Sequence, residues 1–327
     1  MSRTFWAPGR VNLIGEYTDL AGGLVLPAAL DLGVRIEATP AETIDLRASD
    51  LVGVARLAPD GTGLADDSGW ARYVAAVAAE LAALGRPPVG LAGEISSTLP
   101  IGAGLSSSAA LEVGVGLALC AVADFPLEPL ELARAAQRAE HRAVGVPSGI
   151  MDQAACVLGH ADCAILLDTG TLEHELVPLP PELAIVIVHS GIARRLEDSG
   201  YATRKHELEA GDPRRRRHVA TENERVLATV EALRTRDFGR LGEVFHAGHE
   251  SLRVDFEVTT PELDRLVELA YAQGAVAARM TGGGFGGAIV ALVEADSAAA
   301  FADAVLGGYG RGGRAYLCRA SDGAREL

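Results

Sequence analysis

The sequence predicts an α+β protein built from two domains, and three observations support this prediction. The chain has 327 residues, which is more than one compact core usually accommodates. Short apolar runs typical of strands fill the first hundred residues, whereas the last third alternates strand, helix, strand, helix, strand, as in a split βαβ unit. Three prolines clustered within residues 170–182 indicate a boundary, so we expect domains of 1–175 and 176–327.

The first domain is expected to combine a strand-rich start with four helices. The segment 70–84 has the apolar period of an amphipathic helix and stops before Gly85. A helix over 130–144 has Pro129 in its first turn and Gly145 at its end, where both residues are favoured. The other elements expected here are strands at 11–14, 24–30, 34–38, 44–46, 89–97 and 164–167, a helix after 105 through about 122, and a short helix from 149 or 150.

The second domain is expected to begin with a buried strand at 183–188. A long polar helical stretch follows over 194–235 and breaks near 211–213. The run of four arginines after this break, 214–217, is interpreted as a solvated turn. The remaining elements expected are a helix at 261–273, strands at 275–280 and 287–293, a helix at 297–306 and a strand at 314–318.

Composition excludes several classes of partner. The formal net charge is −15, so the surface would repel nucleic acid and anionic membranes. No stretch is long and apolar enough to span a bilayer, and the N-terminus lacks the apolar core of a secretion signal. None of the four cysteines stands in a CxxC pair, and their apolar neighbours predict buried free thiols. We therefore expect a cytoplasmic protein without nucleic-acid or membrane partners.

Lysine is almost missing from the chain, because Lys205 is the only one among 29 basic residues. A Walker-A loop and a protein kinase both need a lysine placed on the ATP phosphates. Lys205 lies in a charged helical stretch without a glycine-rich loop before it. Any phosphate chemistry in this protein must therefore depend on other groups.

The segment LPIGAGLSSSAAL, residues 99–111, is a candidate phosphate-binding loop. Small residues between a strand and a helix let backbone N–H groups approach an anion, and the helix adds the positive end of its dipole. The three serines at 106–108 can donate to phosphate oxygens or ligate a magnesium ion. A dinucleotide-binding loop is excluded, because no third glycine has the required spacing and no ribose-binding acid follows downstream. The alternative is a helix N-terminus with small residues for packing.

Two further segments contain candidate site residues. In AEHRAVGVPSGIMDQ, residues 139–153, Glu140 comes late in one helix and Asp152 early in the next, so a tight corner could aim both carboxylates at one cleft. Taken alone, a surface charge at Glu140 and a helix-start carboxylate at Asp152 are the simpler interpretation. RMTGGGFGG, residues 279–287, has five glycines in six positions, more than a turn between strands needs. This loop is interpreted as one that closes over phosphates.

The segment APGRVNLIGEYTDLAGGLVLP, residues 7–27, sets Arg10, Glu16 and Asp19 among apolar residues and glycines. Charged side chains in a buried setting need partners or a ligand. A polyol is such a ligand, because carboxylates accept hydrogen bonds from adjacent hydroxyls. An exposed turn is the alternative.

Together these segments resemble the GHMP family of small-molecule kinases, and within it the galactokinases. GRVNLIGEYTD (9–19) is similar to the galactokinase signature, and GAGLSSSAALEV (102–113) is similar to the family's ATP-phosphate loop. GIMDQ (149–153) and MTGGGFGG (280–287) complete the set, and weaker similarity between them, as in TENERV (221–226), extends over nearly the whole chain. The resemblance implies a GHMP kinase fold, with an N-terminal ribosomal-protein-S5-like domain, a C-terminal ferredoxin-like domain and the site between them.

The resemblance also implies a kinase that uses ATP and Mg²⁺ to phosphorylate the anomeric hydroxyl of galactose. Asp152 would face that hydroxyl, either as a base or as an orienting group, and Arg10 would pair with Asp152 and the transferring phosphoryl group. Ser108 and Glu140 would hold Mg²⁺. The ATP-binding residues implied are Gly102, Gly104, Ser106, Ser107, Ser108 and, beside the adenine, Trp70. The sugar-binding residues implied are Glu16, Tyr17, Asp19, Gly149, Asp152 and Tyr201.

Several positions depart from the galactokinase pattern. Galactokinases usually have His, Tyr and Asn at the positions of Tyr17, Leu20 and Ala21. They usually have a basic residue followed by His at the positions of Ala193 and Arg194. Tyr17 adds bulk near the expected position of the sugar's C6 hydroxymethyl group. Galactose is the first expectation, and L-arabinose, which lacks C6, is an alternative. Galacturonate is another, if Arg194 or Arg195 pairs with its carboxylate.

Two other classes of function are less expected. A non-catalytic sugar sensor of the galactokinase type would be damaged in the serine loop, whereas residues 106–110 are intact here. A mevalonate or homoserine kinase is disfavoured because Glu16, Asp19 and GIMDQ are of the sugar-kinase type. We expect the protein to act as a monomer.

Overall fold

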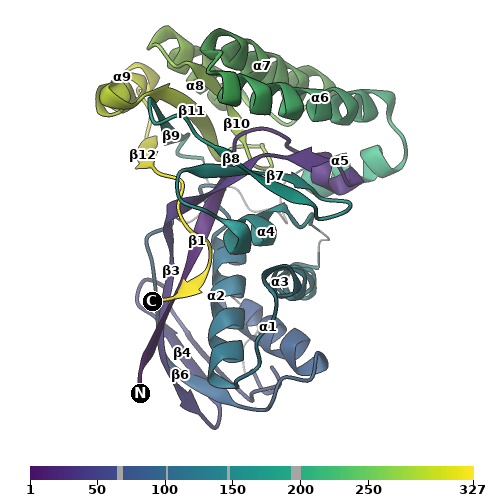
Figure 1. Ribbon diagram of the computed structural model, residues 1–327, viewed down its shortest axis with the longest axis vertical. Coiled ribbons are helices and arrows are strands. Elements are labelled where there is room, and N and C mark those ends of the chain that lie inside the picture. The colour runs from purple at the N-terminus through teal and green to yellow at the C-terminus, as the bar shows by residue number, and fades with distance from the viewer. Residues whose placement is uncertain (65–68, 101, 146–147, 193–199) are drawn as a thin grey trace.

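The computed structural model describes residues 1–64, 69–100, 102–145, 148–192 and 200–327, arranged as two bodies of helices and strands (Figure 1). The lower body in Figure 1 is built on a six-stranded sheet. Its strands, in spatial order, are β13 (Arg325–Glu326), β1 (Arg3–Asn12), β3 (Pro27–Ala41), β6 (Gly90–Ser97), β4 (Ile44–Ala48) and β5 (Val54–Leu57). All neighbours are antiparallel except β4 and β6, which are parallel.

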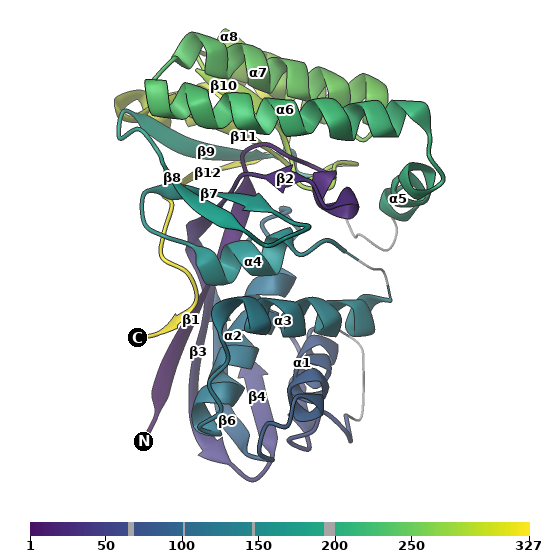
Figure 2. The ribbon, with the colours of Figure 1, turned by 45° about the vertical axis from the view of Figure 1, so that its right-hand side comes forward.

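Four helices cover one face of this sheet. They are α1 (Ala71–Ala83), α2 (Ser107–Val122), α3 (Pro129–Val144) and α4 (Met151–Leu158). Helix α2 packs directly on β1 and β3 and is apolar on almost every side, as expected for a helix buried between a sheet and other helices (Figure 2). Its N-terminus follows the serine loop, so the sheet and α2 together fix where that loop lies.

The upper body is a four-stranded antiparallel sheet with helices packed against it. In spatial order the strands are β10 (Ala277–Thr281), β11 (Ala288–Glu294), β9 (Leu183–His189) and β12 (Arg314–Cys318). Against the sheet pack α7 (Phe238–Ser251), α8 (Pro261–Ala272) and α9 (Ala298–Tyr309). Outside them, α6 (Pro213–Thr235) packs on α7 and α5 (Tyr201–Glu209) on α6, with a π-helical turn at Leu252–Phe256. The chain runs β9, helices, β10, β11, α9, β12, which is the predicted split βαβ arrangement. The predicted α+β fold class is therefore confirmed.

A small three-stranded sheet lies between the two bodies in both views (Figures 1 and 2). Its spatial order is β2 (Leu24–Val25), β7 (Cys163–Asp168) and β8 (His174–Pro178). The boundary expected after residue 175 lies inside β8, and Pro180 and Pro181 follow in the connection to β9. The last residues return to the first sheet through β13, so the division at 175 stays a prediction.

Several elements differ from the expectation, for physical reasons. Strand β1 starts at Arg3, whereas the sequence predicts a start at residue 11. The prediction fails because most of the strand is buried on both faces and it contains Pro8 and Gly9, so the alternating pattern of a strand is hidden. Helix α7 was not expected at all. It carries three glycines, which lower helix propensity, and its stability comes from packing against α6 and β10.

The arginine run at 214–217 is also placed differently from the expectation of a solvated turn. It forms the first turn of α6, where Pro213 opens the helix and the Asp212 carboxylate accepts hydrogen bonds from the backbone N–H groups of Arg214 and Arg215. Arg215 is 1% exposed and is held by ion pairs rather than by water.

The four cysteines are free thiols, as predicted, and three of them are buried. Across the described part of the chain, no helix combines the length and the apolar character needed to cross a membrane.

Candidate active site

A pocket where the two bodies meet brings together eight of the predicted site residues. The residues come from β1, the turn and short 3₁₀ helix that follow it (Thr18–Ala21), α3, α4, α5 and the glycine loop after β10. The lining is Arg10, Glu16, Tyr17, Asp19, Glu140, Ser148, Gly149, Met151, Asp152, Tyr201, Gly282 and Gly283. Sequence reasoning had not singled out Ser148, Met151, Gly282 or Gly283, although all four lie within segments that it had marked.

Asp152 is held by two of the marked segments at once. Arg10 from β1 donates through Nε to Asp152 Oδ1 at 2.8 Å, and its Nη2 lies 2.7 Å from the same oxygen. The hydroxyl of Ser106 donates to Asp152 Oδ2 at 2.5 Å. Arg10 also donates to the carbonyl of Gly104 at 2.7 Å, so β1, the serine loop and the start of α4 are joined at this point. The arrangement fixes the carboxylate at the pocket wall beside the serine loop.

Glu140 lies beside this pair and gathers hydroxyl and amide donors. Ser108 donates to its Oε1 at 2.9 Å, Ser148 to its Oε2 at 2.8 Å, and the Gln153 amide to the same Oε2 at 2.9 Å. Gln153 also donates to Glu112, a fully buried carboxylate whose pKa burial raises well above its usual value. Glu140 lines the pocket, whereas Glu112 lies behind it.

The oxygen atoms of Ser108 and Glu140 suit a magnesium ion. Mg²⁺ prefers oxygen ligands and is usually held by one or two protein groups together with substrate phosphates. Within the described residues, no cluster of three or more His, Cys, Asp or Glu side chains has a metal-binding arrangement. An ion at Ser108 and Glu140 would take its remaining ligands from water or substrate phosphates.

The serine loop has the backbone expected of a loop that wraps an anion. Gly102 and Gly104 have φ angles of 73° and 76°, which favour glycine, and Ser106 at 55° also lies in the left-handed region. Ser107 is exposed at the first position of α2. Trp70, the last predicted ATP residue, stands directly before α1, and its indole N–H donates to the Val52 carbonyl at 3.3 Å. None of the predicted ATP residues lines the pocket that holds Asp19 and Glu16.

Asp19 and Gly149 touch across the pocket. A Cβ at position 149 would lie 1.8 Å from Asp19 Oδ2, so only glycine leaves room for this carboxylate. Burial, together with the negative charge of Asp152, raises the pKa of Asp19 to about 7, although Arg10 acts in the opposite direction. This carboxyl group is accessible from the pocket and poorly solvated elsewhere.

Tyr17 and Tyr201 form an aromatic wall with Phe256 behind them. The ring of Tyr17 lies 4.3 Å from that of Phe256 and 5.4 Å from that of Tyr201, centre to centre. The Tyr17 hydroxyl donates to the Gly283 carbonyl at 2.6 Å, which anchors it to the glycine loop. Tyr17 is 4% exposed, so its bulk lies mainly in the wall and not in the open space of the pocket.

Glu16 lines the pocket, and its carboxylate is held there between Arg279 and the glycine loop. Glu16 Oε2 lies 2.8 Å from Arg279 Nη2, and the Gly282 N–H donates to Oε1 at 3.4 Å. Arg279 also pairs with Glu222. Sequence reasoning assigned no role to Arg279 or Glu222. The sequence does contain one signal for Arg279, because a charged residue within the apolar strand AARMT needs a buried partner.

The positions that depart from the galactokinase pattern are only partly described. Leu20 and Ala21 belong to the 3₁₀ helix and do not line the pocket. Ala193, Arg194 and Arg195 lie outside the described residues, so the galacturonate alternative that depends on them stays a prediction.

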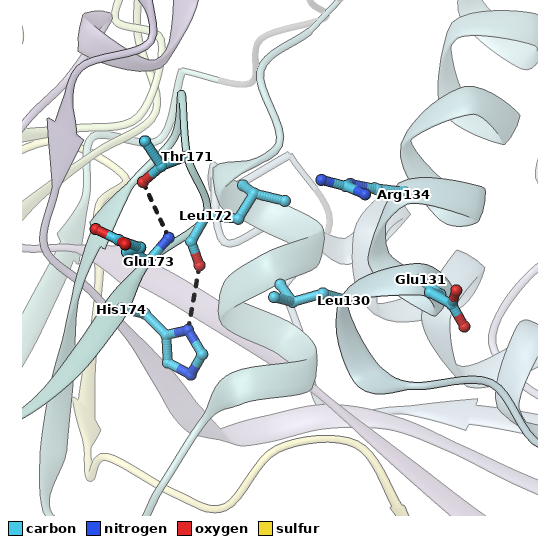
Figure 3. Close-up of a pocket in the computed structure, with 7 residues that line it drawn as sticks. All are labelled: Leu130, Glu131, Arg134, Thr171, Leu172, Glu173 and His174. Carbon is cyan, nitrogen blue, oxygen red and sulfur yellow. Dashed lines mark hydrogen bonds between the residues drawn. The ribbon is translucent and has the colours of Figure 1, made fainter.

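A second pocket, more open than the first, lies between the start of α3 and the β7–β8 hairpin (Figure 3). Its lining includes Leu130, Arg134 and Leu172, and none of the predicted site residues. The hydrogen bonds drawn there join neighbouring residues of the hairpin turn, from the Glu173 N–H to the Thr171 hydroxyl and between the His174 ring and the Leu172 carbonyl. We assign no chemistry to this pocket.

Comparison with known proteins agrees with this geometry. Residues 2–40 match the galactokinase galactose-binding signature, 72–160 the GHMP kinases N terminal domain and 229–310 the GHMP kinases C terminal domain. Galactokinases of Mycobacterium tuberculosis and Pyrococcus furiosus are 39% and 37% identical to the chain, over 93% and 94% of its length and 93% of their own.

A solved structure supports the same relationship. The crystal structure of Lactococcus lactis galactokinase complexed with galactose has a TM-score of 0.93 and 33% sequence identity, and covers 100% of this chain and 95% of that one. The serine loop, the Arg10–Asp152 pair and the glycine loop thus lie within a fold and a sequence that match over almost their full length. The chain belongs to the GHMP kinase family, as a member of its galactokinase group.

Proposed function

We propose that this protein is an ATP-dependent galactose 1-kinase, which transfers the γ-phosphoryl group of ATP to the anomeric hydroxyl of galactose. The observation that carries the proposal is the position of Asp152, which one side chain of the serine loop and one of β1 hold at the wall of a polar pocket. Such a carboxylate can meet a sugar hydroxyl on one side while ATP phosphates lie on the other.

In the proposed reaction, Asp152 accepts a hydrogen bond from the anomeric hydroxyl and orients its oxygen toward the γ-phosphorus. As the new O–P bond forms and the bond to the ADP oxygen breaks, the hydroxyl proton passes to Asp152 and then to solvent. A loose phosphoryl transition state needs little early deprotonation, so orientation accounts for much of the effect. Arg10 pairs with Asp152 and would also stabilise the negative charge of the transferring group.

ATP phosphates are proposed to lie along the loop of Gly102, Gly104, Ser106 and Ser107, at the N-terminus of α2. Ser108 and Glu140 would hold Mg²⁺, which when bound would neutralise charge on the β- and γ-phosphates. Trp70 is proposed to lie beside the adenine. Its hydrogen bond to Val52 would fix the ring in the place where stacking is needed.

Sugar hydroxyls are proposed to contact Glu16, Asp19, Gly149 and Tyr201, with Tyr17 closing one side. Because the Tyr17 ring packs against Phe256 and its hydroxyl donates to the Gly283 carbonyl, its bulk lies in the wall, and we expect the pocket to accept a hexose. Galactose therefore remains the first choice and L-arabinose the alternative. The galactokinase relatives at 37–39% identity favour the same order.

A coupled assay of ADP release tests this proposal with galactose, L-arabinose, galacturonate and N-acetylgalactosamine as acceptors. Galactose is expected to have the highest kcat/KM, and a higher value for another sugar would overturn the assignment. Sugar binding without ADP release would indicate a sensor instead.

The role of Asp152 is tested by Asp152→Asn, which should lower kcat by roughly 100-fold or more while ATP binding persists. Asp303→Asn, on the exposed face of α9, is the matched control and should behave as the wild type. Retained turnover in the Asp152 variant would remove Asp152 from the mechanism. The monomeric state and the cytoplasmic location stay predictions.

A further inference from the structure

A buried cluster of three charged side chains lies directly behind the sugar pocket. Arg279 extends from β10, and its Nη2 lies 2.8 Å from Glu16 Oε2 and 2.6 Å from Glu222 Oε1. None of the three is more than 1% exposed. Glu16 lines the pocket, whereas Arg279 and Glu222 do not. One guanidinium is thus shared between a carboxylate that borders the pocket and a carboxylate from α6 that does not.

The surrounding helices leave room for this cluster. A Cβ at Gly248 of α7 would lie 2.4 Å from Arg279 Nη1, so a larger residue there would displace the guanidinium. The ring of Phe245, one turn earlier in α7, lies 6.0 Å from the guanidinium carbon. The packing of α7 therefore holds Arg279 in one orientation.

The cluster also holds the backbone of the turn that carries Glu16. The Gly15 N–H donates to Glu222 Oε1 at 3.1 Å, and His218 Nε2 of α6 lies 3.1 Å from the Glu16 carbonyl oxygen. The glycine loop contributes the Gly282 N–H at 3.4 Å from Glu16 Oε1. Both the main chain and the carboxylate of Glu16 are thus positioned by α6, β10 and the glycine loop.

The two carboxylates of the cluster have unequal numbers of cationic partners, because Glu222 pairs with two arginines and Glu16 with one. Arg225 adds a second cation to Glu222 at 2.7 Å, and the charges of Arg279, His218 and Arg225 outweigh burial and lower the pKa of Glu222. Burial raises the pKa of Glu16 to about 7 in spite of Arg279. Glu222 is also the nearer partner of Arg279, at 2.6 Å against 2.8 Å for Glu16. The guanidinium is therefore not committed to Glu16 alone, and the Glu16 carboxylate can still accept a hydrogen bond from a sugar hydroxyl.

We propose that Arg279 and Glu222 are positioning residues for the sugar. Arg279 aims the Glu16 carboxylate at the pocket wall, and Glu222 balances the guanidinium so that this carboxylate stays available to a sugar hydroxyl. The inference rests on the proposed role of Glu16 as a sugar ligand. A cluster with a merely structural role would affect sugar and ATP binding alike.

The test is Glu222→Gln, which keeps the shape of the side chain and removes its charge. In this variant Arg279 would pair with Glu16 alone and withdraw its carboxylate from the sugar. We expect the KM for galactose to rise about tenfold, as for a lost hydrogen bond to a charged group, with the KM for ATP within about twofold of the wild type. Glu224→Gln, two residues along α6 and exposed, is the matched control and should change neither constant.

The wild type assayed in parallel separates the two proposals. If the wild type does not phosphorylate galactose, the proposed function fails. If the wild type is active and Glu222→Gln leaves the KM for galactose unchanged, or raises both KM values together, the positioning role is wrong. Should Glu222→Gln fail to fold, Arg279→Lys is judged by the same criterion, because a single ammonium cannot span both carboxylates as the guanidinium does.

Discussion

Asp19 is a residue in which function and stability conflict. Burial and the negative charge of Asp152 raise the pKa of its carboxyl group to about 7, and Arg10 only partly offsets them. In the unfolded chain the same group would titrate near pH 4. The native state therefore binds this proton more tightly than the unfolded state between about pH 4 and pH 7, and stability falls as the pH rises through that window.

We expect Asp19→Asn to raise the melting temperature at pH 8 and to flatten its dependence between pH 5 and pH 8, because an amide has no charge to bury. The variant should also weaken galactose binding about tenfold, since it loses a charged acceptor. Thermal melts at both pH values, with and without galactose, measure these effects, and Asp303→Asn is the control. A melting temperature below that of the wild type at pH 8 would contradict the prediction.

At the scale of an element, the first turn of α6 fastens α5 to the rest of the molecule. Arg215 lies 2.8 Å from Glu207 of α5 and 2.5 Å from Glu257 after the π-helical turn, and it also donates to the Asp255 carbonyl. Helix α5 begins with Tyr201, which lines the pocket. An ion pair made by one buried arginine therefore sets the place of a proposed sugar-binding residue.

Arg215→Gln is expected to lower the free energy of unfolding by about 2 kcal/mol. The cost is below that of breaking a fully buried pair, because Glu207 and Glu257 are 31% and 40% exposed and can be hydrated. Urea denaturation measures the change, and Arg216→Gln, the exposed neighbour, should cost little. Equal losses in the two variants would show that burial at 215 has no special effect.

At the scale of the whole molecule, the C-terminal segment ties the two bodies together. After β12 the chain returns to the first sheet, where Ser321 donates to Ala29 and Leu30 and Ala324 donates to Cys156 of α4. Arg3 and Glu326 then form a pair of hydrogen bonds, both 2.7 Å long. Because Asp152 stands in the first turn of α4, this segment supports the site from the far end of the same helix.

Removal of residues 321–327 is expected to lower the melting temperature by roughly 5 to 10 °C, since several backbone hydrogen bonds of about 1 kcal/mol each are lost. The kcat for galactose should fall as well, because α4 loses its C-terminal support. Differential scanning calorimetry and the coupled assay measure both effects. Removal of the exposed Met1 and Ser2 is the control. An unchanged melting temperature after the longer truncation would refute this role.

Local sequence patterns predict the limits of some helices and strands correctly and those of others wrongly. Helices α1 and α3 lie within one residue of their predicted limits, because amphipathic spacing, Pro129 and Gly145 are local signals. Strand β1 and helix α7 were missed or misplaced, because burial on both faces and three glycines hide the periods by which elements are predicted. Packing against neighbouring elements decides their form.

The sequence by itself determined the α+β class, the kinase family and eight of the residues that meet in the pocket, because short motifs and glycine-rich loops carry that information locally. Only the tertiary structure decided that Glu16 turns toward Arg279, that Tyr17 lies in the wall, and that Arg215 is buried. Each of these depends on a partner more than 50 residues away or on the packing of several elements, and no local pattern specifies which distant charge or ring a side chain will meet.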